Sequence, residues 1–430
     1  MPPNPAGEDN LPQIPIIVLY GDGADTIKGC IMADMEIIIT PATPIPDFLV
    51  KDVLSKMAYV DELIVKAAYN ENGNLTIKCS KKPSAQENID LEAKIQRCVN
   101  TLVATTRKPK IKIHENHMDL KVPFSVDPMP LLLESGQVTK LNNGLFAMGP
   151  VVASLCKYFE NRLFELGFAF GAKNHRFPAM VPSEFLEKIQ YFKNFTHSLS
   201  FVAHLREDLE IIEKFAQDVA CDSEGCIQPP PGSLAKVGNM LSPAVCHNFY
   251  LFLANRVLKE EPVIGTALGN CFRYESINLT SLERLWSFTM WEVIFVGSAP
   301  KVLDCLDRTS KAANTLMQEL GLAYQVENAN DPFFVGEYGT QAGFQQLYDL
   351  KHEFRAKLPY KDGSLAVGSR NYHMDFFGRS VNITLADGTT AHSGCVAFGL
   401  ERMAFAFVSQ YGIDPDKWPT NIRQAVGPGL

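Results

Sequence analysis

Two short stretches in the second half of the 430-residue chain bring charged and aromatic side chains together at strand spacing. In an extended strand every second side chain lies on the same face, so Arg273 and Glu275 share one face of the first stretch. Arg284 and Phe288 share one face of the second stretch in the same way. If the stretches pair antiparallel, the four side chains line a common surface. Guanidinium groups match phosphate oxygens and an aromatic ring offers a stacking plane, so this surface suits a nucleoside triphosphate. A salt-bridged hairpin without a ligand is the alternative interpretation.

A third arginine lies near the end of the chain, where a strand-like stretch runs through Gly399 into an apolar helix. Arg402 falls in the first turn of that helix. The free amides and the dipole of a helix N-terminus favour anions, and an arginine there extends a phosphate site. Taken alone, such an arginine is an ordinary surface residue in most proteins, but the upstream arginines favour a shared triphosphate site.

The ten cysteines are scattered without regular spacing, which does not indicate a disulfide framework. In a reducing compartment their thiols are free to bind metal, although a single cysteine more often fills a buried apolar position. Glu292 is harder to explain as a packing residue, because it lies within the apolar run Trp291–Val296 and a buried unpaired carboxylate is costly. Some of these side chains are therefore candidates for a metal site.

The elements that must position these residues follow one another largely without intervening helices. Strands are expected at 265–275, 286–296, 372–377, 380–385 and 391–398, a succession that favours an antiparallel sheet over a parallel one. Amphipathic helices are expected at 151–166, 205–220 and 302–320, and a strand interrupted by prolines at 168–181.

A proline-rich stretch, residues 122–130, resists regular structure and is expected to link two domains. Before it, short β-rich runs (16–20, 37–40, 75–79 and 111–114) mix with helical stretches (48–54 and 91–102). The expected organisation is a disordered tail (1–13), a small N-terminal α/β domain (14–120) and a large catalytic domain (121–430) with a helical insertion at about 203–240.

The composition limits the partners of the protein. A net charge of -8 argues against indiscriminate binding to nucleic acid, because phosphate affinity comes from clustered Lys and Arg. The one basic run, at residues 107–112, is more simply a solvated strand or loop. No stretch has the apolar length of a membrane span, and no signal-peptide pattern opens the chain. A cytoplasmic protein without a membrane partner is expected.

Together these features resemble the catalytic domain of class II aminoacyl-tRNA synthetases. The second signature of that class, an Arg-x-Glu strand, a loop, and then an arginine followed by a phenylalanine, is matched by Arg273, Glu275, Arg284 and Phe288. The third signature, Gly-Leu-Glu-Arg at the start of a helix, is matched by residues 399–402. The weaker first signature is matched by the long helix that leads to Pro178.

Within the class, the chain resembles the amino acid:[carrier protein] ligases, relatives of the methanogen-type seryl-tRNA synthetases, over roughly residues 118–427. The likeness rests on Phe177-Pro, His197–Val202, Ser242–Cys246, Cys271–Glu275, Phe288–Gly297, Asp331–Phe334 and His392–Cys395. It implies an α+β fold, in which an antiparallel sheet is flanked by helices, and a homodimer.

The resemblance also implies roles for the residues that match the signatures. Arg273 would hold the α-phosphate of ATP, Glu275 the adenine edge and Phe288 the adenine face. Arg284 and Arg402 would hold the γ-phosphate. All five are therefore expected to bind ATP, and Arg273 and Arg402 are expected to act in catalysis.

A zinc ion held by Cys246, Glu292 and Cys395 is implied by the same resemblance. Thiolates and a carboxylate suit Zn²⁺, and three protein ligands leave a fourth position open. The resemblance assigns that position to the α-amino group of the substrate.

Magnesium is expected with ATP, but the chain departs here from the class. Synthetases of this class commonly carry an acidic magnesium ligand on the strand before the third signature. In the corresponding stretch of this chain, residues 364–375, the only acidic residue is the last one, Asp375. Ser369 and Asn371 offer oxygen ligands instead, directly or through water, and the magnesium ligands are left undecided.

Three functions are compatible with the sequence. The favoured one is ATP-dependent activation of a small amino acid, such as glycine, alanine or serine, as an aminoacyl-adenylate that is passed to the phosphopantetheine thiol of a holo-carrier protein. The second is an atypical zinc-dependent seryl-tRNA synthetase, for which the small N-terminal domain argues. The third is a non-catalytic binding or regulatory paralogue, against which the complete set of arginines and zinc ligands argues.

Overall fold

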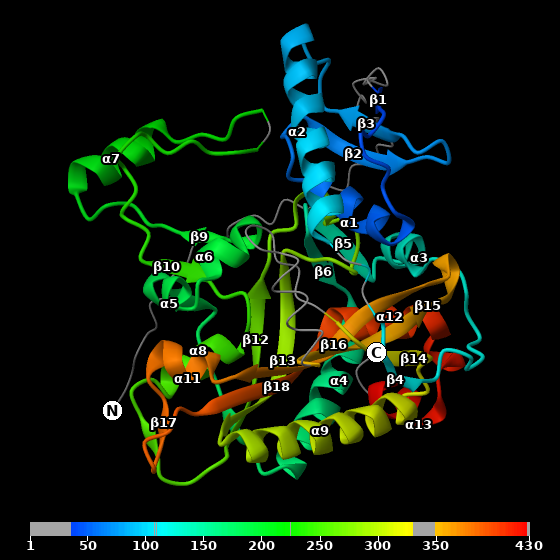
Figure 1. Cartoon of the computed structure of the whole chain (residues 1–430), viewed down its shortest axis with the longest axis vertical. Coiled ribbons are helices and arrows are strands. Elements are labelled where there is room, and N and C mark those ends of the chain that lie inside the picture. Colours follow the sequence, from blue (N-terminus) through cyan, green and yellow to red (C-terminus); the bar gives the residue numbers. More distant parts are fainter. Residues whose placement is uncertain (1–35, 107, 109, 224, 330–348, 428–430) are drawn as a thin grey trace, which may run out of the picture.

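An eight-stranded sheet forms the centre of the molecule (Figure 1). The computed structural model describes residues 36–106, 108, 110–223, 225–329 and 349–427. In spatial order the strands are β4 (Ile113–Asn116), β14 (Tyr324–Asn328), β15 (Lys351–Leu358), β16 (Gly363–Met374), β18 (His392–Gly399), β13 (Ser287–Gly297), β12 (Val263–Phe272) and β7 (Lys173–His175). All neighbours pair antiparallel except β12 and β7, which are parallel. The predicted α+β class with an antiparallel sheet is confirmed.

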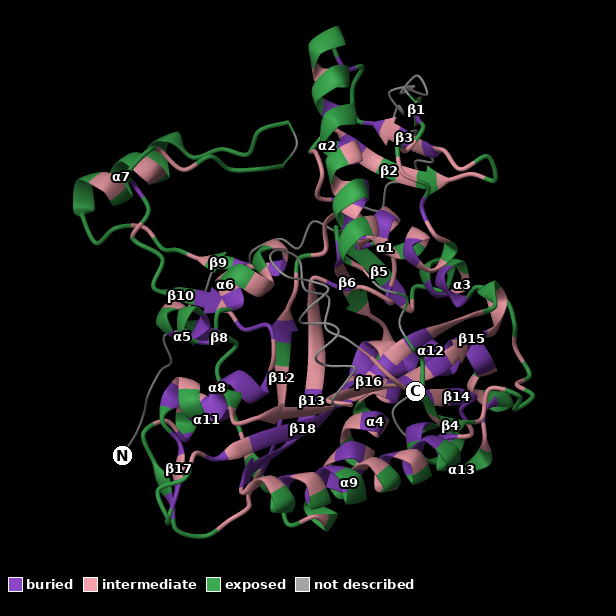
Figure 2. Ribbon diagram, in the orientation of Figure 1, coloured by how far each residue is buried: buried purple, intermediate pink, exposed green. Residues whose placement is uncertain are grey.

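Three long helices pack against one face of this sheet. They are α4 (Pro150–Ala169), α9 (Ala299–Glu319) and α12 (Leu400–Tyr411), and their apolar residues join the largest core cluster. Alternation along β13 separates the two faces: Trp291 and Val293 point into this core, whereas Ile294 belongs to a second cluster on the other side. Figure 2 shows the buried residues gathered where the helices meet the sheet.

A small unit with its own core precedes the large sheet. It contains β1 (Glu36–Ile39), α1 (Asp47–Met57), β2 (Ile64–Tyr69), β3 (Leu75–Cys79) and α2 (Ala85–Thr105), with the strands in the order β1-β3-β2. Leu49 and Val53 on α1 face Leu91 and Ile95 on α2, each pair four residues apart as helix packing requires. Ser84 caps the N-terminus of α2 in a capping box with Glu87, which provides hydrogen-bond acceptors for two backbone amides at the helix start.

The small unit contacts the loop that joins β12 to β13. The Ser276 hydroxyl donates to the carbonyl of Ala58 at 3.2 Å, and the Asn278 amide donates to the carbonyl of Ser55 at 3.4 Å. Between them, Ile277 packs against the small unit's core. The loop is therefore held from outside the large sheet.

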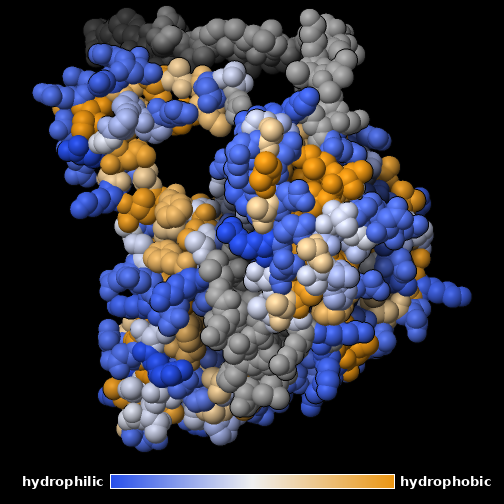
Figure 3. All heavy atoms as spheres, turned by 45° about the horizontal axis from the view of Figure 1, so that its top comes forward, coloured by the Kyte–Doolittle hydropathy of each residue, from blue (hydrophilic) through white to orange (hydrophobic). Residues whose placement is uncertain are grey.

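Residues 203–223 and 225–238 form an arm that projects from the body and contains α7 (Leu209–Asp218). The arm connects β9 (Phe201–Val202) to β10 (Asn239–Leu241), which pair in a small sheet with β8 (Met180–Pro182). None of the residues of α7 is buried. In the space-filling view the arm stands apart from the body, with a gap beside it and apolar side chains among the polar ones (Figure 3). The insertion predicted at about 203–240 has its counterpart in this arm.

The remaining elements are short. They are α3 (Pro128–Glu134), β5 (Val138–Asn142), β6 (Leu145–Met148), α5 (Ser183–Lys188), α6 (Tyr191–Asn194), α8 (Cys246–Phe252), β11 (Val257–Leu258), α11 (Phe376–Val381), β17 (Thr384–Leu385) and α13 (Thr420–Val426). Among the described residues, none of the helices has the length and apolar character needed to cross a membrane.

Several sequence predictions differ from the structure. The strand expected at 111–114 is β4, which pairs with β14, so it belongs to the large sheet rather than to the small unit that was expected to reach residue 120. The strands expected at 372–377 and 380–385 form only at their outer ends, where residues 372–374 end β16 and Thr384–Leu385 form β17. Between them lies α11, because Phe377 and Val381, four residues apart, are buried on one helical face. The stretch 168–181 begins as the last turn of α4 and is extended only at its two short strands.

The expected linker at 122–130 already contains the start of α3, since Pro128 suits a first helical turn and Asp127 caps it. The tail at 1–13 and the strand at 16–20 lie outside the described residues.

Candidate active site

The two stretches with alternating charges form one antiparallel hairpin, which meets the condition set in the sequence analysis. β12 and β13 pair along their full length, with Cys271 opposite Phe288. Beyond the last paired residues, the Arg273 backbone amide donates to the Trp286 carbonyl at 2.9 Å and extends the pairing. The arginine guanidinium lies over the Phe288 ring, 5.4 Å from its centroid.

A cleft on the face opposite the three helices collects four of the five residues expected to bind ATP. Arg273, Glu275, Phe288 and Arg402 all line it. The fifth, Arg284, does not line the cleft but forms an ion pair with Glu275 at its margin. A broader hollow beside Phe170 and Arg308 contains none of these residues, so the chemistry points to the narrower cleft.

The charge of Glu275 is set by the arginines around it. Burial alone would raise the pKa of this carboxyl group, but Arg284, Arg402 and Arg273 outweigh burial and lower it. The carboxylate is therefore ionised at neutral pH. It can accept a hydrogen bond from an amino group such as that on the adenine edge.

Arg402 is fixed in place before any ligand arrives. Its Nε donates to the Glu283 carbonyl at 2.7 Å and its Nη1 to the Ala366 carbonyl at 3.2 Å. Neither of these bonds uses its Nη2. The preceding residue, Glu401, ties the start of α12 to β13, because both its oxygens accept the Thr289 amide at 2.9 Å. The guanidinium is thus presented to the cleft by a rigid frame.

The sequence analysis missed a carboxylate in the cleft. Glu353 lines it together with Lys351, and both lie on β15, a strand that the sequence analysis did not predict. Glu353 stands directly opposite Ser369, which was considered as an oxygen ligand for magnesium. The signal was present in the alternation of Phe354, Ala356 and Leu358 with polar residues, which is typical of a half-buried strand.

Cys246, Glu292 and Cys395 converge on the same face of the sheet, farther along β13. Their ligand atoms all lie within 4.8 Å of one another, and all three side chains are buried. Cys246 opens α8, Glu292 lies on β13, and Cys395 lies on β18 opposite Ile294, two residues along from Glu292. Residues far apart in the sequence are therefore brought together as expected for a common ligand.

The chemistry of this cluster fits a zinc ion. One Glu292 oxygen accepts the backbone amides of Val245 and Cys246, at 3.0 and 3.2 Å, while the other is buried without a hydrogen-bond partner. The hydrogen bond to Cys395 and burial raise the pKa of the Cys246 thiol well above its usual range, and burial raises the pKa of Glu292. A bound cation would displace these protons and neutralise the anionic groups that burial disfavours.

Aromatic side chains surround the cysteine on α8. Tyr250 stacks on Phe377 with ring centroids 4.0 Å apart, and its hydroxyl lies 3.2 Å from Nδ1 of His373. His247 contacts Phe185 and Phe377 edge-on or tilted. The helix that begins at Cys246 is therefore anchored in an aromatic cluster.

The fold is that of the class II aminoacyl-tRNA synthetase core. The model of the tRNA synthetase class II core domain (G, H, P, S and T) matches residues 236–411. A crystal structure of the M. kandleri SerRS with A. aeolicus tRNASec has a TM-score of 0.67 and 19% identity, and it covers 91% of this chain and 77% of that one. The fold is therefore shared with seryl-tRNA synthetases.

Curated relatives narrow the assignment. Amino acid--[acyl-carrier-protein] ligase 1 of Bradyrhizobium diazoefficiens is 32% identical over 258 residues, which cover 60% of this chain and 77% of the relative. The chain belongs to the class II synthetase-like family that contains these ligases, and it is a ligase. A type-2 serine--tRNA ligase of Methanocaldococcus jannaschii is 27% identical over 74% of this chain, which spans only 63% of that relative.

Proposed function

We propose that this ligase activates a small amino acid with ATP as an aminoacyl-adenylate and transfers the aminoacyl group to the phosphopantetheine thiol of a carrier protein. The observation that supports it most is the placement of two sites on one strand. Phe288 in the cleft and Glu292 in the Cys-Glu-Cys cluster are four residues apart on β13, about 13 Å along the strand. A molecule that carries adenine at one end and an amino group at the other fits this arrangement.

In the proposed first step, the carboxylate of the amino acid attacks the α-phosphorus of ATP. A new phosphorus–oxygen bond forms, the bond to the bridging oxygen breaks, and pyrophosphate leaves. No general base is required, because the attacking carboxylate is already ionised at neutral pH. Arg273 stabilises charge on the α-phosphate, while Arg284 and Arg402 hold the leaving pyrophosphate.

Metal ions complete the proposal. Class II synthetases use Mg²⁺ with ATP, and Glu353 with Ser369 across from it are the candidate ligands in this cleft. The cluster of Cys246, Glu292 and Cys395 would hold zinc, which offers an open coordination position to the substrate's amino group when bound. The chain's own residues then orient the carboxylate toward the triphosphate.

The acceptor assignment is supported by the names of relatives. Two ligases of Bradyrhizobium diazoefficiens, both 32% identical, are named for acyl-carrier proteins. In the second step the acceptor thiol would attack the aminoacyl carbonyl, form a thioester and release AMP.

Serine transfer to tRNA is the second candidate. The type-2 serine--tRNA ligases align with more of this chain than the carrier ligases do, 74% against 60%. The M. kandleri SerRS structure covers 91% of the chain, a share that extends beyond the large sheet. The division into a small N-terminal domain and a catalytic domain, and the homodimer expected from the class, are part of this proposal.

Purified protein incubated with ATP, a labelled amino acid and either holo-carrier or bulk tRNA tests the acceptor. We expect label on the holo-carrier and none on tRNA or on apo-carrier, which lacks the thiol. Label on tRNA alone would reject the carrier in favour of the second candidate. Exchange of pyrophosphate into ATP, measured with each of glycine, alanine and serine, tests the adenylate step without an acceptor. Light scattering on the same preparation tests the dimer.

A further inference from the structure

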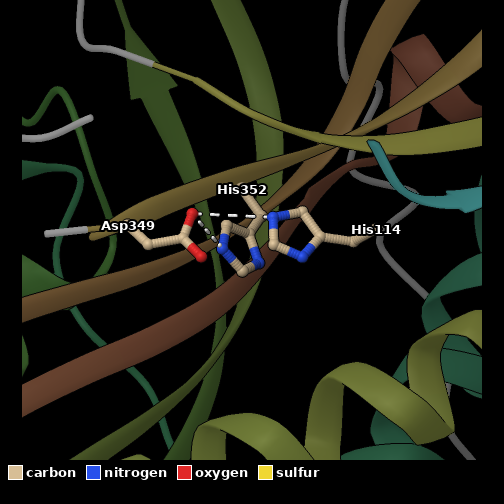
Figure 4. Close-up of side chains that lie close together, drawn as sticks. All are labelled: His114, Asp349 and His352. Carbon is tan, nitrogen blue, oxygen red and sulfur yellow. Dashed lines mark hydrogen bonds and ion pairs between the residues drawn. The ribbon is translucent and has the colours of Figure 1, made fainter. Parts of the chain in front are cut away.

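A second cluster of metal-ligating side chains lies away from the active site. His114 on β4, Asp349 in the turn just before β15, and His352 on β15 place their ligand atoms within 4.8 Å of one another (Figure 4). Oδ1 of Asp349 lies 3.0 Å from Nε2 of His352 and 3.5 Å from Nε2 of His114. One carboxylate oxygen is therefore shared between two imidazole nitrogens.

The backbone is arranged to bring these side chains together. The pairing of β4 with β14 shifts register at Val326 and Glu327, which leaves His114 as an extra residue in a bulge. Bulges of this kind redirect a side chain, and they are common beside functional sites. Asp349 has a φ of 53°, in the left-handed region that non-glycine residues rarely adopt. Its other oxygen, Oδ2, is held by Lys112 at 3.1 Å, which leaves Oδ1 directed at the rings.

The donor set and its spacing match a divalent metal. Two imidazole nitrogens and a carboxylate oxygen are the ligands that zinc and its neighbours accept in proteins. Tetrahedral zinc bonds near 2.05 Å place neighbouring ligand atoms about 3.3 Å apart, between the two oxygen-to-nitrogen distances given above. Nε2 of His114 is also buried, and Oδ1 of Asp349, 3.5 Å away, does not complete a hydrogen bond to it. A buried nitrogen of this kind needs a proton acceptor or a cation.

We propose that His114, Asp349 and His352 bind a divalent cation, with Zn²⁺ as its probe, at a site separate from the Cys-Glu-Cys cluster. The rings now stack with centroids 3.9 Å apart and an angle of 28° between their planes. Binding therefore requires one ring to turn so that both nitrogen lone pairs meet at the ion. Side-chain exposures of 21% for His114, 37% for Asp349 and 14% for His352 leave room for that turn and for water as a fourth ligand.

The position of the site gives it a structural role. His114 lies on the segment that leads from the small unit into the large sheet, whereas His352 lies inside that sheet. A bound ion would cross-link β4 to β15 across the intervening strand β14. On β15 side chains alternate, so His352 and Glu353 point to opposite faces and the ion would not contact the cleft.

The test is a metal count on full-length protein prepared with zinc and desalted. The His352→Asn variant should hold one equivalent less than the wild type, and His114→Asn, from a different segment, should lose the same equivalent. His204→Asn is the matched control, since His204 is exposed on the arm. Equal zinc in wild type, His352→Asn and His114→Asn would overturn the proposal.

Cobalt distinguishes this site from the cysteine cluster even if a histidine variant folds poorly. In the Cys395→Ala background, Co²⁺ should give visible d–d bands without the thiolate-to-cobalt charge-transfer band, because the ligands are nitrogen and oxygen only. Adding Asp349→Asn should remove those bands. A Cys395→Ala protein that gives no d–d bands with Co²⁺ would also overturn the proposal.

Discussion

Arg402 and Arg284 are both expected to hold the γ-phosphate, but the structure prepares them differently. Arg402 is partly buried and is fixed by two backbone carbonyls, at 2.7 and 3.2 Å. The side chain of Arg284 is 40% exposed and is paired with Glu275, which it must leave to reach a phosphate. Lysine in place of either arginine keeps the positive charge but loses the planar guanidinium with its fixed N–H donors. The two substitutions therefore measure how much the fixed donor geometry contributes to ATP binding.

We expect Arg402→Lys to be the more damaging change. A lysine ammonium cannot satisfy both carbonyls and a phosphate oxygen, so one charge-assisted contact is lost, worth about 2 to 3 kcal/mol. That loss lowers kcat/KM for ATP about 30- to 150-fold. For Arg284→Lys, a partly exposed ion pair contributes about 1 kcal/mol or less, so we expect a decrease of no more than about fivefold.

Exchange of pyrophosphate into ATP at saturating amino acid measures both variants. Arg423→Lys is the matched control, because Arg423 lies on α13 outside the cleft and should leave the exchange rate unchanged. Thermal melts establish that each variant is folded at the assay temperature. An equal loss in the two variants, or a larger loss for Arg284→Lys, would refute the argument that the rigid frame around Arg402 matters.

Three further predictions follow from other parts of the molecule. Cys395→Ala should lose one zinc equivalent together with the amino acid-dependent exchange of pyrophosphate into ATP. Metal analysis and the exchange assay on the same protein measure both losses. Full exchange in a protein with less zinc would contradict the proposed role of the zinc cluster. Gly321→Ala should lower the free energy of unfolding in urea by about 1 to 3 kcal/mol more than Gly388→Ala. Both glycines have a positive φ, but only at Gly321 would a new Cβ meet another atom closely, the Tyr411 hydroxyl at 2.5 Å; equal losses would exclude this clash as the cause. Burial lowers the pKa of His197 to about 4, below its ordinary 6.5, so the unfolded chain binds a proton first as the pH falls. The free energy of unfolding should therefore fall by up to about 3 kcal/mol between pH 6.5 and 4, and His197→Gln should flatten this dependence in urea titrations; an unchanged slope would count against it.

Local patterns predicted the parts of the site that lie on regular elements. Alternation predicted which side chains share a face of each strand, and the antiparallel pairing that was set as a condition is present in the structure. The start of α12 was predicted from the glycine that precedes it, so Arg402 was correctly placed in a first turn. The approach of Cys246 to Cys395 came from the family resemblance, since nothing in their spacing along the chain indicates it.

Other features depend on tertiary contacts that no local pattern contains. β4 pairs with a strand more than 200 residues away, so its short sequence gave no sign of which sheet it would join. The burial of Phe377 and Val381 on one helical face overrode an apolar composition that favoured a strand. Glu353 was missed because its contribution to the cleft depends on the position of β15 beside β16.

The placement of Phe288 and Glu292 on one strand has a consequence for how such enzymes change over time. A slip of β13 by a single residue would turn Phe288 away from the cleft and Glu292 away from the two cysteines at once, because strand geometry repeats every second residue. Under the proposed function, insertions and deletions within this strand would therefore disturb the recognition of ATP and of the amino acid together. New substrate preferences in descendants of this protein should arise by exchange of the side chains around β13, while its length and register are inherited unchanged.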